Sequence, residues 1–91
     1  MAITLELFGM ARELVGAPSV SLDVGEPAPL RTLLAELAAR YPQLVGQVLD
    51  ATTNAPLDPN VVLLDGRRAQ GLDEPIGDAD RPCLLFLPSG G

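Results

Sequence analysis

Ile3-Thr4-Leu5-Glu6-Leu7-Phe8, near the start of the 91-residue chain, places apolar residues at every second position. An alternation of period two is typical of a β-strand with one buried face, so we expect a strand over residues 2–8. Val20, Leu22 and Val24 alternate with polar residues in the same way. The segment between the two runs is short enough to join them as an antiparallel hairpin.

The next periodic segment has helical spacing. Between Leu30 and Tyr41 the apolar residues recur at positions 30, 33, 34, 37, 38 and 41, which is the pattern of an amphipathic helix. Pro29 suits the first helical position, where a missing N–H group costs nothing. Pro42 disfavours helical backbone at the preceding residue and so ends the helix. We therefore expect one main helix over residues 30–41.

The second half of the chain contains shorter apolar runs separated by turn-forming residues. Asp65-Gly66 is a strong signal for a tight turn between two strands. The composition predicts, in this order, a helical turn within 44–50, a loop over 52–60, a strand over 61–64, a return strand over 67–70, a loop over 72–80 and a last strand over 83–87.

This order of elements predicts the fold class. A hairpin followed by one helix and further strands fits an α+β domain in which the helix covers one face of a mixed sheet. That is the outline of a β-grasp, and a different α+β arrangement is the alternative. We expect residues 1–87 to form the domain and residues 88–91 to be a flexible C-terminal tail.

The face of the sheet turned away from the helix is expected to carry apolar residues. If Leu5 faces the helix, strand alternation places Phe8 on the opposite face. The last strand is apolar on both faces, so part of Leu84, Leu85 and Phe86 must also lie there. An exposed apolar cluster indicates a protein interface, and the alternative is that the loops cover it.

Composition limits the partners, the compartment and the chemistry. Twelve acidic and six basic residues, all arginine, give a net charge of −6, which opposes binding to nucleic acid or to an anionic membrane. No signal peptide or membrane-spanning run is visible, so we expect a cytoplasmic protein. The lone Cys83 excludes an internal disulfide and is most often a small buried hydrophobe.

The chain also lacks the side chains on which most enzymes depend. It has no histidine and no lysine, which excludes Ser-His-Asp and Cys-His sites, His-ligated metals and Schiff bases. We therefore expect no metal, no bound cofactor and no catalysis by this chain alone. The sequence ends with Gly90-Gly91, whose missing Cβ atoms would let a terminal carboxylate enter a narrow active site as a substrate. A frayed terminus is the alternative.

Several short motifs spread along the whole chain support the interpretation of the C-terminal carboxylate as a substrate. In order, they are Phe8-Gly9-Met10-Ala11-Arg12-Glu13-Leu14-Val15-Gly16, Leu33-Leu34-Ala35-Glu36-Leu37, Gly77-Asp78 and Pro88-Ser89-Gly90-Gly91. Together they resemble the MoaD/ThiS family of ubiquitin-like sulfur carriers. Within that family they are most similar to the MoaD branch, the small subunits of molybdopterin synthase.

The resemblance implies that Gly91 is the reacting residue and that Gly90 gives it access to an active site. A MoeB-like, E1-like enzyme would use ATP to convert the Gly91 carboxylate to an acyl adenylate, and a sulfur donor protein would then yield a thiocarboxylate. A MoaE-like large subunit would use that sulfur to build the dithiolene of molybdopterin. The resemblance places the contacts with these partners at Phe8, Leu85, Phe86, Pro88 and Ser89.

Other functions fit the same tail. Related carriers serve thiamine synthesis, cysteine synthesis or tRNA thiolation. A ubiquitin-like modifier would form an amide between Gly91 and a lysine of a partner, and without lysines of its own this chain would be added singly. A binding module with an idle tail belongs to a third class.

Overall fold

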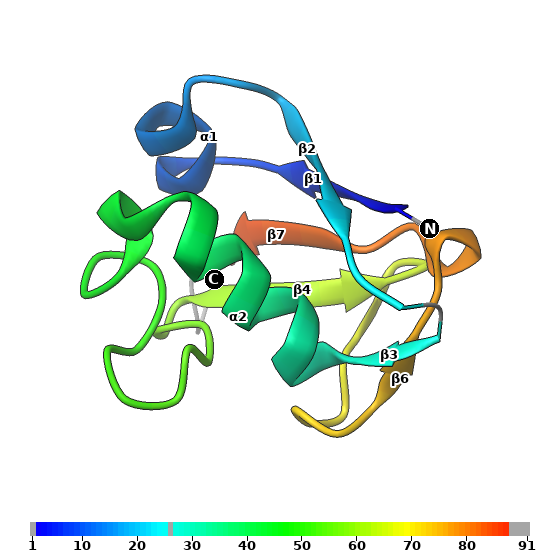
Figure 1. Ribbon diagram of the computed structural model, residues 1–91. Helices are drawn as coiled ribbons and strands as arrows, with labels where there is room; N and C mark the ends of the chain where they lie inside the picture. The colour runs from blue at the N-terminus through cyan, green and yellow to red at the C-terminus, as the bar shows by residue number, and fades with distance from the viewer. Residues whose placement is uncertain (1, 26, 88–91) are drawn as a thin grey trace.

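A computed structural model describes residues 2–25 and 27–87, which form a mixed sheet crossed on one face by a single long helix (Figure 1). The main sheet has five strands in the order β2-β1-β7-β4-β5. Its strands are β1 (Ala2–Leu7), β2 (Ser19–Asp23), β4 (Asn60–Leu64), β5 (Arg67–Arg68) and β7 (Cys83–Phe86). The first and last of these in the chain, β1 and β7, lie side by side and are parallel, whereas the other neighbours are antiparallel. The expected α+β, β-grasp arrangement is confirmed.

The core lies between the hairpin and the helix α2 (Leu30–Arg40). Every second residue of β1 is buried, and Leu5 lies opposite Val20 of β2 in the antiparallel register. On the helix, Leu33 and Leu37 are fully buried. The apolar face of the hairpin and the apolar face of the helix therefore pack against each other in one core.

The start of α2 differs from the expectation. Pro29 precedes the helix in extended conformation, as part of a short strand β3 (Ala28–Pro29) that pairs with β6 (Pro75–Ile76). No side chain caps the helix. Instead, the N–H of Leu30 donates to the carbonyl of Glu74 (2.9 Å) and the N–H of Arg31 to that of Leu72 (2.8 Å). These carbonyls satisfy two of the N–H groups that a helix leaves free in its first turn.

Several boundaries predicted from the sequence were wrong. The hairpin connection holds a short helix α1 (Met10–Val15), which is too brief for a helical period to show. Short 3-10 helices occupy Pro42–Leu44 and Asp78–Asp80, and β6 interrupts the expected loop over 72–80. β5 is shorter than the expected 67–70, and β1 and β7 end one residue early, at Leu7 and Phe86.

The Asp65-Gly66 turn is confirmed. Both residues have positive φ, 52° and 84°, and they join β4 directly to β5. A two-residue hairpin turn with positive φ at both positions matches the right-handed twist of the strands, and Asp-Gly is one of the sequences that favour it. Among the described residues, no helix is long and apolar enough to cross a bilayer.

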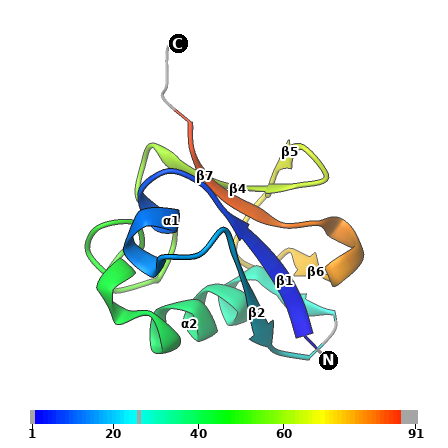
Figure 2. The same ribbon diagram turned by 90° about the horizontal axis from the view of Figure 1, so that it is seen from above.

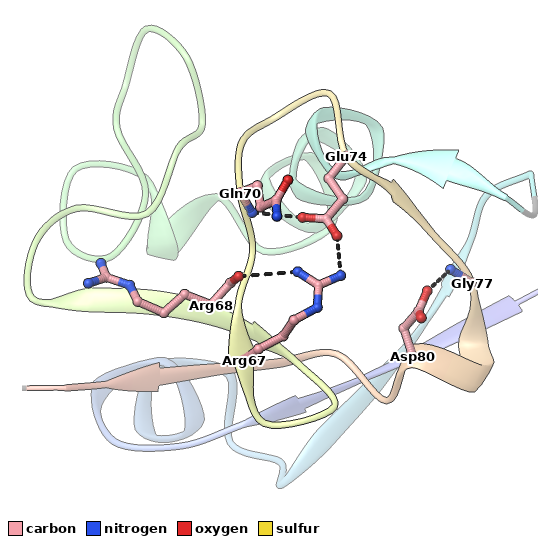
Figure 3. A network of polar contacts seen from close by, with 6 residues as sticks. All are labelled: Arg67, Arg68, Gln70, Glu74, Gly77 and Asp80. Carbon is pink, nitrogen blue, oxygen red and sulfur yellow. Dashed lines mark hydrogen bonds and ion pairs between the residues drawn. The ribbon is translucent and has the colours of Figure 1, made fainter.

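Glu74 fastens the segment that follows β5 (Figure 3). Its Oε2 accepts a hydrogen bond from the Arg67 guanidinium, and its Oε1 accepts one from the backbone N–H of Gln70 (2.7 Å). These bonds, that from Arg67 first, hold the pKa of the Glu74 carboxyl below its ordinary value of 4.5. The ionised form is therefore favoured in the folded state.

We expect the Glu74 bonds to make the fold sensitive to acid. A lowered pKa contributes stability above pH 4.5, and that contribution is lost as the pH falls through the folded-state pKa. Glu74→Gln should therefore lower the melting temperature slightly at neutral pH. Between neutral pH and about pH 3, the melting temperature of the variant should also fall less than that of the original chain. Melting curves by circular dichroism measure both effects. The control is Asp73→Asn, which removes the more exposed ion pair with Arg31; an equal change in both variants would contradict the prediction.

Candidate functional site

Four large apolar side chains are exposed in the described part of the chain, and they come from two neighbouring segments. Phe8 (39% exposed) and Met10 (44%) lie at the start of α1, while Phe86 (47%) and Leu87 (44%) lie at the end of β7. Figure 2 shows the end of β7 running past the turn that joins β1 to α1. We call these four residues the apolar patch.

Backbone contacts fix the two halves of the patch relative to each other. The N–H of Phe8 donates to the carbonyl of Leu84 (2.9 Å), which extends the parallel pairing of β1 and β7 by one bond. The N–H of Leu87 donates to the carbonyl of Pro59 (2.9 Å). The backbone is thus held up to the last described residue, immediately before the C-terminal tail.

Arg12 holds the ring of Phe8. Its Nε donates to the carbonyl of Leu7 (2.8 Å), and its guanidinium carbon lies 4.9 Å from the centroid of the Phe8 ring. A guanidinium over an aromatic face is attracted to it electrostatically. Arg12 therefore orients Phe8 and places a positive charge beside the patch, in a chain whose net charge is −6.

The structure brings together only part of the predicted site. Phe8 and Phe86 are both exposed, whereas Leu84 is fully buried and Leu85 is half-buried. The strand register places Phe8 beside Leu85 on the outer face of the sheet, and it places Phe86 on the face that carries Leu84. The predicted contacts Pro88 and Ser89, the reacting residues Gly90 and Gly91, and the expected tail over 88–91 lie outside the described residues.

Sequence analysis assigned no role to Met10 or Arg12, although both stand in the motif that starts at Phe8. Met10 lies in α1, which carries no visible period, so its exposure could not be predicted. Arg12 follows Phe8 by four residues. This spacing indicates a side-chain contact only in a helix, and α1 was not predicted. An aromatic residue and a cationic residue at that spacing are the feature of the sequence from which the contact between Phe8 and Arg12 could have been predicted.

Cys83 lies on the outer face of β7 and is half-buried. Burial raises the pKa of its thiol above the ordinary value of 9.0, and the negative charge of Glu6 raises it further. Because only the thiolate is a good nucleophile, these surroundings lower the reactivity of the cysteine. The position agrees with the role of a small partly buried hydrophobe.

We expect Cys83 to be alkylated slowly in the folded protein. At about pH 8, iodoacetamide should modify it several-fold more slowly than it modifies a small free thiol, because less of Cys83 is ionised and its sulfur is partly covered. Unfolding in guanidinium chloride should restore the ordinary rate. Mass spectrometry of quenched samples measures both rates, and equal rates in the folded and unfolded chain would contradict the prediction.

The remaining hollows do not suggest a reaction centre. One of about 350 Å³ lies on the outer face of the sheet, lined by Thr4, Glu6, Arg12, Pro18, Ser19, Asp78 and Arg81. Within residues 2–25 and 27–87, no three His, Cys, Asp or Glu side chains gather as a metal site would require.

Comparison of the sequence with protein-family models and with curated protein sequences yields no match. Comparison with solved structures finds the same fold. The crystal structure of SAMP1 from Haloferax volcanii is 27% identical over the whole of both chains, with a TM-score of 0.75.

Two further structures show the same fold at lower identity. SAMP1 from Methanosarcina acetivorans, a small archaeal modifier protein, is 23% identical (99% of this chain, 95% of that one; TM-score 0.76). A putative molybdopterin converting factor subunit 1 from Pyrococcus furiosus is 21% identical (97% and 98%; TM-score 0.74). These neighbours are consistent with the resemblance to the MoaD/ThiS ubiquitin-like family.

Proposed function

We propose that this chain is a ubiquitin-like sulfur carrier whose Gly91 carboxylate is activated by an E1-like enzyme and converted to a thiocarboxylate. The observation that carries the proposal is an exposed apolar patch at the end of β7, directly before a tail that ends in Gly90-Gly91. The likeness to SAMP1 over the whole of both chains supports it. A docking surface next to a reactive end is what a protein-borne substrate needs.

The chemistry requires a partner, because a carboxylate is a poor electrophile. A carboxylate oxygen of Gly91 attacks the α-phosphorus of ATP, pyrophosphate leaves, and an acyl adenylate forms. A persulfide of the donor protein then attacks the acyl carbon, and AMP leaves. A thiol reductant cleaves the resulting acyl disulfide, which releases the Gly91 thiocarboxylate and leaves the donor sulfur in a disulfide with the thiol. The partner binds the ATP and supplies the catalytic groups, which suits a chain without histidine or lysine that is not catalytic alone.

The apolar patch supplies the orientation for this step. Phe8 and Phe86 each act as an aromatic anchor for the partner, because buried aromatic residues carry much of the binding energy of an interface. Leu85, Pro88 and Ser89 complete the contact around the tail. The net charge of −6 favours a partner with a basic surface and speeds the encounter.

For the acceptor, we propose molybdopterin synthesis in the cytoplasm. The motifs that begin at Phe8 and end at Gly91 are most similar to the MoaD branch, and the fold is shared with a putative molybdopterin converting factor subunit 1. The chain would then be the small sulfur-donor subunit of a synthase, with a MoaE-like large subunit as its second partner. Thiamine synthesis, cysteine synthesis and tRNA thiolation are the competing pathways.

Reconstitution with an E1-like enzyme from the same genome tests the proposal. With ATP, magnesium and the carrier, the enzyme should exchange labelled pyrophosphate into ATP. After addition of a sulfur donor, the intact chain should gain the mass of one oxygen-to-sulfur exchange. An active enzyme that leaves the mass unchanged would refute the carrier function. If the thiocarboxylate forms but no large subunit uses its sulfur to build molybdopterin, the acceptor belongs to another pathway.

A second candidate, a ubiquitin-like protein modifier, is favoured by the likeness to SAMP1, which is described as a small archaeal modifier protein. Gly91 would then form an amide with a lysine of another protein. Trypsin does not cut before proline, so Arg81-Pro82 should survive and each target lysine should carry residues 69–91. Peptides with this remnant in a digest of cells that make the protein would support the modifier function, and their absence would count against it.

A further inference from the structure

Gly9 lies between the patch residues Phe8 and Met10, where the chain turns from β1 into α1. Its backbone has φ 66° and ψ −137°, a conformation that is essentially restricted to glycine. A Cβ at this position would lie 3.2 Å from the Cβ of Phe86, which is tighter than an ordinary contact. Position 9 therefore requires glycine both for its backbone and for the space beside β7.

Hydrogen bonds on both sides tie this position to its neighbours. The N–H of Phe8, one residue before, donates to Leu84 of β7 (2.9 Å). The carbonyl of Gly9 accepts from the N–H of Glu13 in α1 (3.2 Å). A shift of the backbone at Gly9 must therefore move α1 against β7, and with it one half of the apolar patch against the other.

We propose that Gly9 is a positioning residue for docking. It lets the corner between β1 and α1 lie directly on β7, so that Phe8 and Met10 are held in a fixed position relative to Phe86 at the end of β7. The inference rests on the proposed function, because the shape of the patch matters only if a partner binds it. Gly9 touches no reacting atom.

Gly16 provides a matched control at the other end of α1. It also has positive φ, 84°, and its N–H donates to the carbonyl of Arg12 (2.8 Å). A Cβ there would meet no atom within 4 Å. Gly16→Ala thus strains the backbone of the same helix without pressing on Phe86, and both alanine variants should lower the melting temperature.

The kinetic test uses pyrophosphate exchange by the E1-like enzyme at varied carrier concentration, at a temperature where circular dichroism shows every variant folded. Gly9→Ala should raise the KM for the carrier about tenfold with kcat nearly unchanged, because docking and not chemistry is weakened. Gly16→Ala should leave the KM within about twofold of the original. If the two variants have the same KM, the positioning role is overturned.

A double-variant cycle identifies Phe86 as the residue through which Gly9 acts. Phe86→Gly removes the Cβ that a Cβ at position 9 would press against, so only the backbone strain of Gly9→Ala remains in that background. Gly9→Ala should then raise the KM no more than about twofold, as Gly16→Ala does. Gly16→Ala should behave alike in both backgrounds. A full tenfold effect of Gly9→Ala without Phe86 would overturn the mechanism. Because the clash is absent there, the double variant also replaces Gly9→Ala if the single variant does not fold.

Amide spectra separate this inference from the proposed function. In ¹H–¹⁵N correlation spectra, Gly9→Ala should shift the signals of residues 84–87, whereas Gly16→Ala should not. If the wild-type chain supports no pyrophosphate exchange, the proposed function fails. The spectra alone then decide whether Gly9 fixes the positions of the residues of the apolar patch. Unchanged signals for residues 84–87 in Gly9→Ala would overturn the inference even if the carrier is active.

Discussion

Deletion of Gly91 should abolish conversion of this chain to a thiocarboxylate and leave its melting temperature unchanged. The shortened chain still ends in a carboxylate, but the acyl carbon is withdrawn by one residue, about 3.5 Å. Reacting atoms must approach to about that distance before bond formation, and a misplacement of 1 Å can already cost about a hundredfold in rate. The fold should not respond, because the described core ends with β7 at Phe86.

The mass of the intact chain, after incubation with the activating enzyme, ATP and the sulfur donor, measures this effect. Ser89→Ala is the matched control: it changes one contact of the tail but keeps the length of the tail and both glycines, so its rate should fall far less than that of the deleted chain. Full thiocarboxylation of the deleted chain would contradict the proposal. Unchanged function of the deleted chain in cells would instead favour a binding module with an idle tail.

Phe8→Asp and Phe86→Asp should each weaken partner binding by about a hundredfold or more, since loss of a central aromatic anchor costs about 2–4 kcal/mol and a buried carboxylate adds to this. The fold should tolerate both changes, because each ring is more than a third exposed. At position 8 the new carboxylate would also lie near Arg12, which can pair with it in place of the ring. Isothermal titration against the activating enzyme, together with melting curves, measures binding and stability separately.

The control for these variants is Leu84→Ala, in the same strand as Phe86. Leu84 is fully buried, so its truncation should cost about 2–5 kcal/mol of stability through the cavity that it leaves. Its effect on partner binding should be small at temperatures where the variant is folded. If Phe8→Asp or Phe86→Asp destabilises the chain as much as Leu84→Ala does, these rings belong to the core and the patch is not a docking surface.

The hairpin, the long helix and the Asp65-Gly66 turn could all be predicted from the sequence. Each depends on a signal between near neighbours in the chain: the alternation through Leu5, the helical spacing through Leu33, and the positive φ that Asp-Gly tolerates. The exposure of Phe8 belongs to the same group, because it follows from strand alternation. The absence of histidine and lysine, which composition alone reveals, also limits the chemistry that this chain can perform.

The rest depends on residues far apart in the chain. The first turn of α2 has no side-chain cap, and its N–H groups are satisfied by the carbonyls of Leu72 and Glu74, which no local pattern could reveal. Likewise, Phe8 lies beside β7 only because Glu6 pairs in parallel register with Cys83. Sequence alone therefore determined the hairpin, the long helix, the Asp65-Gly66 turn and the glycine pair at the end, because these rest on local periodicity and composition. Tertiary structure decided the arrangement of the apolar patch, because long-range strand pairing brings the corner at Gly9 against β7.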